Sequence, residues 1–269
     1  MTELPEHVHK AAVRYSEPLF LSSPYAIGGH NARTANGTIT YVRHRGETFG
    51  ITCAHVYYQQ FSPVPERWLT VRGRENFVFP LHETIGRTPR SLFRATCGPD
   101  CDDGPDIAIA RLPEAVTEFH FERKGKEAFN LDEWVEPDWS ELTAAVASGF
   151  PTEHKSEGDG FVRAPFVAVV AELTRPISPA DDIFLMASTL QKEHNFYFSG
   201  MSGGAVYCVS DSDRTLELIG IVFAGTPGGS ADWNARGESS FLTDRDVQIR
   251  ARTLTPEKFE HWLELAELK

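Results

Sequence analysis

The sequence predicts an all-β fold, either a sandwich or a barrel, that ends in a C-terminal helix. Short apolar runs rich in β-branched and aromatic residues recur along the chain, and turn residues separate them. No long helical pattern alternates with these runs, which argues against a parallel sheet. The chain has 269 residues, 41% of them hydrophobic, which is enough apolar content for a sizeable core.

The first strand pair is predicted to be a hairpin. Asn36-Gly37 leads into a β-type run over 38–42, and Arg45-Gly46-Glu47 turns the chain into a second run over 48–52. We expect the later strands at 68–71, 77–79, 107–112, 143–150, 166–171, 183–186, 203–209 and finally 216–223.

Two segments carry helical signals. Residues 5–15 are expected to form a short N-terminal helix. At the other end, Thr255 suits the N-cap position and Pro256 the first helical position. Apolar side chains then share one face at the spacing i, i+3, i+4 and i+7: Phe259, Trp262, Leu263 and Ala266. We expect this second helix to dock on the β core.

Charge and cysteine content limit the partners and the compartment. The formal net charge is −12, so nucleic acid and anionic membrane surfaces are poor partners, and no apolar run is long enough to span a bilayer. The first six residues have neither the basic start nor the apolar run of a signal peptide. The four cysteines, Cys53, Cys97, Cys101 and Cys208, are few and irregularly spaced. We therefore expect a cytoplasmic protein with free thiols.

Three short segments contain residues that could perform catalysis. His55 follows a β-type run in Gly-Ile-Thr-Cys-Ala-His, Asp106 opens the apolar run of 107–112, and Ser202 lies in Gly-Met-Ser-Gly-Gly. Each segment alone has a structural explanation: a histidine at a strand end, a solvated carboxylate at a strand start, and a glycine-rich turn. The three together fit nucleophilic catalysis, because a hydroxyl needs a neighbouring base and that base needs an orienting carboxylate.

With these motifs in the order His, Asp, Ser, the sequence resembles the trypsin-like (chymotrypsin-fold) serine peptidases. Gly149-Phe150-Pro151 and 220–225, Gly-Ile-Val-Phe-Ala-Gly, are similar to stretches of that family, as is the C-terminal helix. The resemblance implies two six-stranded antiparallel β-barrels with a C-terminal helix. The implied division is an N-terminal extension (1–34), a first barrel (35–120), a connection (121–140), a second barrel (141–250) and the helical end (251–269).

The resemblance also implies roles for individual residues. His55 would be the general base, Asp106 its orienting carboxylate and Ser202 the nucleophile, with the amides of Gly200 and Ser202 as the oxyanion hole. The residues expected to bind substrate are Phe196, Tyr197, Phe198 and Ser199 before the nucleophile, and Phe223, Ala224 and Gly225 on the strand that pairs with an extended peptide. The aromatic residues favour a small or apolar side chain before the cut. No cofactor and no metal ion is expected.

Some positions depart from the family or leave alternatives open. Met201 replaces the acid that pairs with a new N-terminus in cleavage-activated members, so we expect no such activation. Cys97 and Cys101 flank Gly-Pro-Asp and fit either a local disulfide or half a metal site. Asp102 and Asp103 rival Asp106, which we prefer because an apolar strand follows it directly.

The function expected from this resemblance is that of a serine endopeptidase acting on a protein or peptide. A regulatory protein partner is one option for its control. The alternatives are a catalytically inactive member that binds peptide strands, and an esterase on the same scaffold. Labelling by a serine-directed probe separates the first alternative from an enzyme, and a preference for peptides over simple esters excludes the second.

Overall fold

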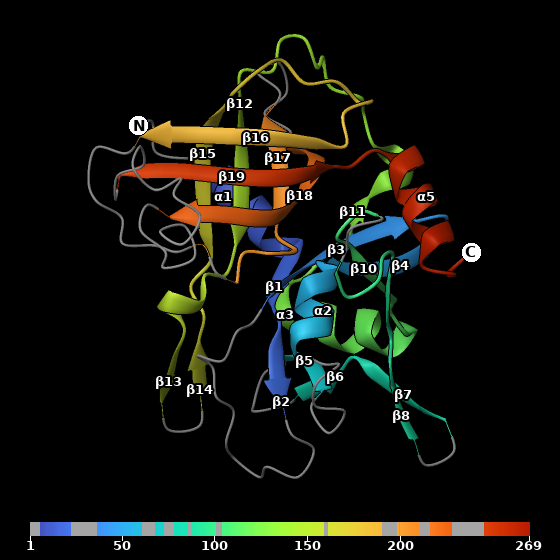
Figure 1. Ribbon diagram of the computed structural model, residues 1–269. Coiled ribbons are helices and arrows are strands. Elements are labelled where there is room, and N and C mark those ends of the chain that lie inside the picture. The colour runs from blue at the N-terminus through green and yellow to red at the C-terminus, as the bar shows by residue number, and fades with distance from the viewer. Residues whose placement is uncertain are drawn as a thin grey trace.

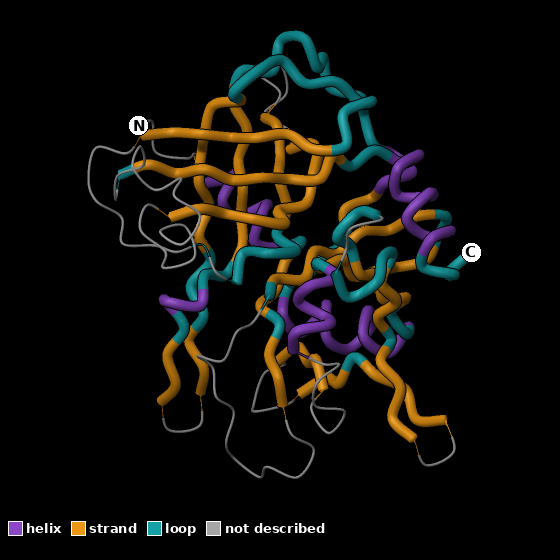
Figure 2. Tube along the Cα trace, in the orientation of Figure 1, coloured by secondary structure: helices purple, strands orange, loops and turns teal. Residues whose placement is uncertain are grey.

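The computed structural model describes residues 6–22, 37–60, 68–72, 78–85, 88–100, 104–158, 161–189, 198, 200–209, 216–227 and 245–269. Within these residues the chain forms two β halves, with a C-terminal helix against the first half (Figure 1). Figure 2 shows that strands make up most of both halves.

The helical elements are α1 (Glu6–Arg14), α2 (Ala54–Gln60), η1 (Val116–Phe121), α3 (Glu122–Lys124), η2 (Leu131–Glu133), η3 (Thr152–His154) and α5 (Pro256–Leu265). The strands of the first half are β1 (Ser16–Pro18), β2 (Phe20–Ser22), β3 (Thr38–His44), β4 (Glu47–Thr52), β5 (Trp68–Arg72), β6 (Val78–Pro80), β7 (His82–Ile85), β8 (Thr88–Ser91), β9 (Phe93–Ala95), β10 (Ala108–Arg111) and β11 (Phe129–Asn130). The later strands are β12 (Ala144–Gly149), β13 (Ser156–Gly158), β14 (Phe161–Arg163), β15 (Val167–Leu173), β16 (Ile183–Thr189), β17 (Ala205–Val209), β18 (Leu216–Pro227) and β19 (Asp246–Thr253).

The second half is a closed antiparallel barrel of six strands in the order β12-β15-β16-β19-β18-β17. Its interior is filled by apolar side chains that alternate along the strands with outward-facing ones. Examples are Ala147 on β12, Met186 on β16, Val206 on β17 and Ile249 on β19, all fully buried. This barrel confirms the closed antiparallel architecture expected for the second half of the chain.

Strand β19 is an element that the sequence interpretation missed, because the last strand was expected at 216–223. Along β19 the inward side chains are Val247, Ile249, Ala251 and Thr253, and the residues between them are more exposed. That strict alternation was the available signal. Polar and charged residues at every second position hid it, since only half of such a strand is apolar.

The first half contains a six-stranded sheet in the order β1-β3-β4-β10-β9, with β11 pairing in parallel with β3. Strands β2, β5 and β6 form a separate three-stranded sheet, and β7 pairs with β8. The predicted hairpin is confirmed: β3 and β4 pair antiparallel through a turn at Arg45 and Gly46, both of which have positive φ. Two consecutive positive φ values are typical of the tight turns that match the twist of a hairpin.

Both predicted helices are confirmed, as α1 and α5. In α5 the Thr255 side chain accepts a hydrogen bond from the Lys258 amide at 3.2 Å, as expected for an N-cap. The helix buries Phe259, Trp262 and Leu263, and the Phe259 ring lies edge-on to the ring of Phe49 on β4, with ring centroids 5.5 Å apart. The C-terminal helix is therefore docked on the first sheet.

One expectation about the cysteines is wrong. Cys97 is disulfide-bonded, whereas Cys53 and Cys208 are free and buried. Cys101 lies outside the described residues. Because disulfides are rare in reducing compartments, the cysteine content no longer supports a cytoplasmic location.

Among the described helices, none combines the length and the apolar character needed to cross a membrane.

Candidate active site

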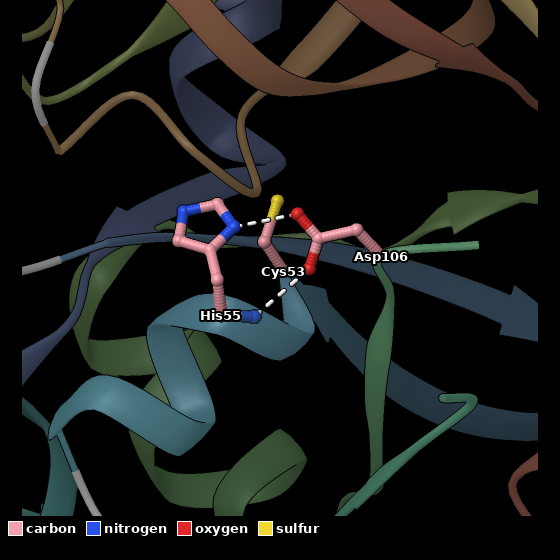
Figure 3. Close-up of side chains that lie close together, drawn as sticks. All are labelled: Cys53, His55 and Asp106. Carbon is pink, nitrogen blue, oxygen red and sulfur yellow. Dashed lines mark hydrogen bonds and ion pairs between the residues drawn. The ribbon is translucent and has the colours of Figure 1, made fainter. Parts of the chain in front are cut away.

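Asp106 holds His55 by two hydrogen bonds (Figure 3). Its Oδ1 accepts from the His55 backbone amide at 2.8 Å, and its Oδ2 lies 2.6 Å from Nδ1 of the ring. The carboxylate therefore fixes both the main chain and the ring of the histidine. A carboxylate at Nδ1 favours the tautomer that carries its proton there and leaves Nε2 free to accept one.

The local structure of these two residues differs in detail from the sequence interpretation. His55 is not at the end of a strand but in the first turn of α2, after β4 has ended at Thr52. Asp106 lies two residues before β10 and is 9% exposed. The His55 side chain is 30% exposed, so its ring is partly open to solvent while its partner is shielded.

A third side chain, Cys53, lies beside the pair in Figure 3. Its sulfur and one ligand atom each of His55 and Asp106 lie within 4.8 Å of one another. Burial, followed by the nearby Asp106 carboxylate, raises the pKa of the Cys53 thiol well above its usual value. The thiol donates instead to the carbonyl oxygen of Val222 at 3.2 Å. This contact ties the sulfur to the backbone of β18.

Ser202 lies in a tight loop that only glycine can form at two positions. Gly200 has φ +88° and Gly203 has φ +89°. A Cβ on Gly203 would lie 2.1 Å from the Thr38 carbonyl oxygen, and one on Gly204 would lie 1.9 Å from that of Ser148. The glycines of the Gly-x-Ser-Gly-Gly motif therefore supply both positive φ and close backbone approach.

Two amides of this loop have no hydrogen-bond acceptor among the described residues, those of Gly200 and Ser202. The amides of the other three described loop residues are occupied: Met201 donates to Phe198, Gly203 to Val222 and Gly204 to Met201. The unoccupied pair is the pair named in the sequence analysis for an oxyanion. Backbone amides without an acceptor can stabilise such a charge.

Threonines of the first sheet hold the loop from the other half of the molecule. The Thr38 hydroxyl donates to the Gly200 carbonyl at 2.8 Å, and the Thr40 hydroxyl donates to the Gly203 carbonyl at 2.7 Å. The Thr38 amide donates to the Ser202 carbonyl at 2.8 Å. The sequence analysis did not single out these threonines, because they look like ordinary β-strand residues and their role depends on contact between the halves.

The Ser202 hydroxyl donates to the carbonyl oxygen of Phe223 at 3.5 Å. This distance is at the long limit for a hydrogen bond, so the contact is weak. Among the described residues no hydrogen bond joins Ser202 to His55. The structure therefore unites His55 with Asp106, places Ser202 in a preformed loop, and leaves the hydroxyl turned toward β18.

The residues expected to bind substrate are only partly described. Phe196, Tyr197 and Ser199 lie outside the described residues. Phe198 is 3% exposed and belongs to the core of the second barrel, with a φ of +44°. The Cβ of Phe198 packs closely on Gly225: a Cβ added to Gly225 would lie 2.8 Å from it. Phe223, Ala224 and Gly225 are partly exposed on β18.

Comparisons with known proteins add one finding about the fold. No protein-family model matches the chain, and no curated protein matches it in sequence. The chain is similar in structure to a thermostable serine protease from an extremophilic microorganism, with a TM-score of 0.54 and 12% sequence identity. The match covers 95% of this chain and 98% of the other. The chain therefore has a chymotrypsin-like β fold, with a closed six-stranded barrel, a second sheet and a C-terminal helix.

Proposed function

We propose that this chain is a serine endopeptidase of the trypsin-like type. Ser202 attacks the peptide carbonyl, and its proton passes to Nε2 of His55 and then to the leaving amine. The amides of Gly200 and Ser202 bind the oxyanion of the tetrahedral intermediate. Water then attacks the acyl-enzyme while Nε2 of His55 takes its proton. The carboxylic acid product leaves, and His55 returns the proton to Ser202.

The observation that carries this proposal is the arrangement of hydrogen bonds at the site. Asp106 holds His55 at two points, while the Gly200 and Ser202 amides have no acceptor among the residues that the structure describes. In the proposed mechanism the Ser202 hydroxyl gives up its 3.5 Å contact with the Phe223 carbonyl oxygen and rotates toward His55. Catalytic hydrogen bonds are often long or misaligned without substrate, so the lack of a Ser202–His55 bond among the described residues is compatible with this step.

We further propose that the substrate is a protein or peptide bound as an extended strand along 223–225. The partial exposure of these residues on β18 supports strand addition, in which main-chain hydrogen bonds give affinity. A preference for small or apolar residues before the cut, and control by a regulatory protein partner, also belong to the proposal.

A fluorophosphonate probe tests this function directly, because it forms a covalent bond only with an activated serine. The folded wild-type protein should be labelled, and Ser202→Ala should abolish labelling. Ser140→Ala, at an exposed serine whose hydroxyl bonds Asp138, is the matched control and should be labelled like the wild type. An unlabelled wild type would instead indicate the non-catalytic peptide binder. A labelled protein that cleaves simple esters but no peptide library would indicate the esterase.

A further inference from the structure

A cavity of about 190 Å³ lies where the two halves and the C-terminal helix meet. Its walls include Gly104 and Pro105 from the segment before Asp106, Asp182 before β16, Arg252 on β19, and Lys258 and His261 on α5. Clefts for drug-sized ligands measure about 300–1,000 Å³. This cavity is therefore suited to a small molecule or ion.

The charges at the cavity are unevenly compensated. Lys258 donates to Asp182 Oδ1 at 2.7 Å and to the Asp181 carbonyl at 2.8 Å, so these two opposite charges neutralise each other. His261 lies 3.5 Å from Glu264 on its own helix. Arg252 has neither an ion pair nor a hydrogen bond with any described residue, and its Nε is fully shielded from solvent. The Asp182 carboxylate also interacts electrostatically with Arg252, so two cationic side chains, Lys258 and Arg252, share this carboxylate and the described lining carries an excess positive charge.

The Arg252 guanidinium has no hydrogen-bond acceptor among the described residues. Its guanidinium presents five N–H donors in a planar fork that matches carboxylate and phosphate oxygens. The Arg252 guanidinium lies over the Phe223 ring, 5.0 Å from the centroid, which covers its face and leaves the shielded Nε without an acceptor. A buried donor without an acceptor costs free energy, so an oxyanion in the cavity would stabilise the folded protein.

We propose that this cavity is a binding site for a small oxyanion, a carboxylate or phosphate group held by Arg252. The site adjoins the proposed catalytic residues on two sides. Pro105 directly precedes Asp106, and Phe223, whose ring covers Arg252, provides the carbonyl that accepts from Ser202. A bound anion would therefore stabilise the positions of Pro105, next to Asp106, and of Phe223, which contacts Ser202. This second part, an effect on catalysis, rests on the proposed function, whereas binding does not.

Binding is tested by calorimetric titration with inorganic phosphate and, separately, with acetate, in chloride buffer of constant ionic strength. The wild type should bind one of them saturably with one site per chain, and the stronger ligand identifies the anion class. Arg252→Met should weaken binding at least tenfold. Arg252→Lys, which retains the charge but loses the fork, should also bind more weakly than the wild type. Arg250→Met, the same change at an exposed residue of the same strand outside the cavity, is the control and should bind like the wild type.

Thermal unfolding provides the second readout, because phosphate stabilises most proteins through exclusion from their surface. The general effect should appear equally in all variants. The additional, saturable gain should appear in the wild type and Arg250→Met and be absent from Arg252→Met. Equal gains in all variants, or no saturable heat with either anion, would overturn the site. Saturable anion binding by a wild-type protein that the probe does not label would count against the proposed function alone.

Discussion

The Thr38 hydroxyl donates to the carbonyl oxygen of Gly200 at 2.8 Å, which ties the first strand of the β3–β4 hairpin to the loop of Ser202. The same hydroxyl accepts from the Phe150 amide at 3.1 Å, so one buried side chain joins three segments. The proposed oxyanion hole therefore depends on a residue 162 positions earlier in the chain.

Thr38→Val keeps the shape of the side chain and removes both hydrogen bonds. Because it leaves the Gly200 carbonyl buried without a donor, we expect a loss of about 1–3 kcal/mol in the free energy of unfolding. A misplaced loop should also slow probe labelling by up to about 10²-fold. Thr117→Val, at a threonine whose hydroxyl bonds a nearby surface carbonyl, is the control for the same change. Wild-type labelling rates in Thr38→Val would show that other contacts position the loop.

Asp106→Asn should leave the fold intact and lower turnover by about 10⁴-fold, the loss described for the corresponding change in trypsin. The amide cannot accept from both the His55 backbone and its ring as the carboxylate does, and it favours the wrong imidazole tautomer. Steady-state kinetics on a cleaved peptide would measure the loss, with Asp100→Asn at an exposed aspartate as control. Equal losses from Asp102→Asn or Asp103→Asn would contradict the choice of Asp106.

Gly203→Ala and Gly46→Ala separate backbone strain from steric clash. Both glycines have positive φ, but a Cβ on Gly46 meets nothing within 4 Å, whereas one on Gly203 meets the Thr38 carbonyl at 2.1 Å. Gly46→Ala should cost about 1–2 kcal/mol, the left-handed penalty alone. Gly203→Ala should cost more than about 4 kcal/mol, since backbone cannot move aside as a side chain can. Urea unfolding measures both, and similar losses would refute the close approach.

The half-buried Lys126, which lies near the buried Glu17, predicts a pH dependence of stability. Burial lowers the pKa of Lys126 to about 8 from its usual 10.5, although the Glu17 charge opposes this. Between these pH values the unfolded chain binds more protons at Lys126 than the native chain, so this residue makes stability rise with pH. Below about pH 8 Lys126 is charged in both states, and the cost of burying its charge lowers the free energy of unfolding by the full amount.

Lys126→Gln should therefore remove this rise. The free energy of unfolding of the wild type, minus that of the variant, should increase by at most about 3 kcal/mol from pH 8 to 10.5. Urea unfolding at several pH values measures the difference, which cancels other titrating groups. The control Lys10→Gln, at a solvent-exposed lysine, should show a flat difference. A flat difference for Lys126→Gln as well would show that Lys126 titrates normally.

The uncut chain should be active if the proposed function holds. Met201 is fully buried among the apolar side chains of the second barrel, and its thioether offers a new N-terminal ammonium no negative charge. Intact-mass spectrometry should therefore find the probe on the full-length protein. Labelling that appears only after cleavage near Ile27, which lies outside the described residues, would contradict this prediction.

The sequence by itself determined the local features of this protein. The β3–β4 hairpin follows from turn chemistry, α5 follows from its cap and its apolar face, and the ordered His, Asp and Ser motifs indicated the fold class. These signals depend on neighbours within a few residues. The polar alternation of β19 was also local, but it was missed because charged residues occupy every second position.

Only the tertiary structure decided how the distant parts support one another. Three features depend on contacts between segments far apart in the chain or on burial: the hydrogen bonds of Thr38 and Thr40 to the Ser202 loop, the disulfide state of Cys97, and the shielded Nε of Arg252 without an acceptor. A threonine on a strand or an arginine near a helix has the same appearance in sequence whether or not it has a partner. Hydrogen bonds and desolvation act over a few ångströms in space, and the fold sets which residues come that close.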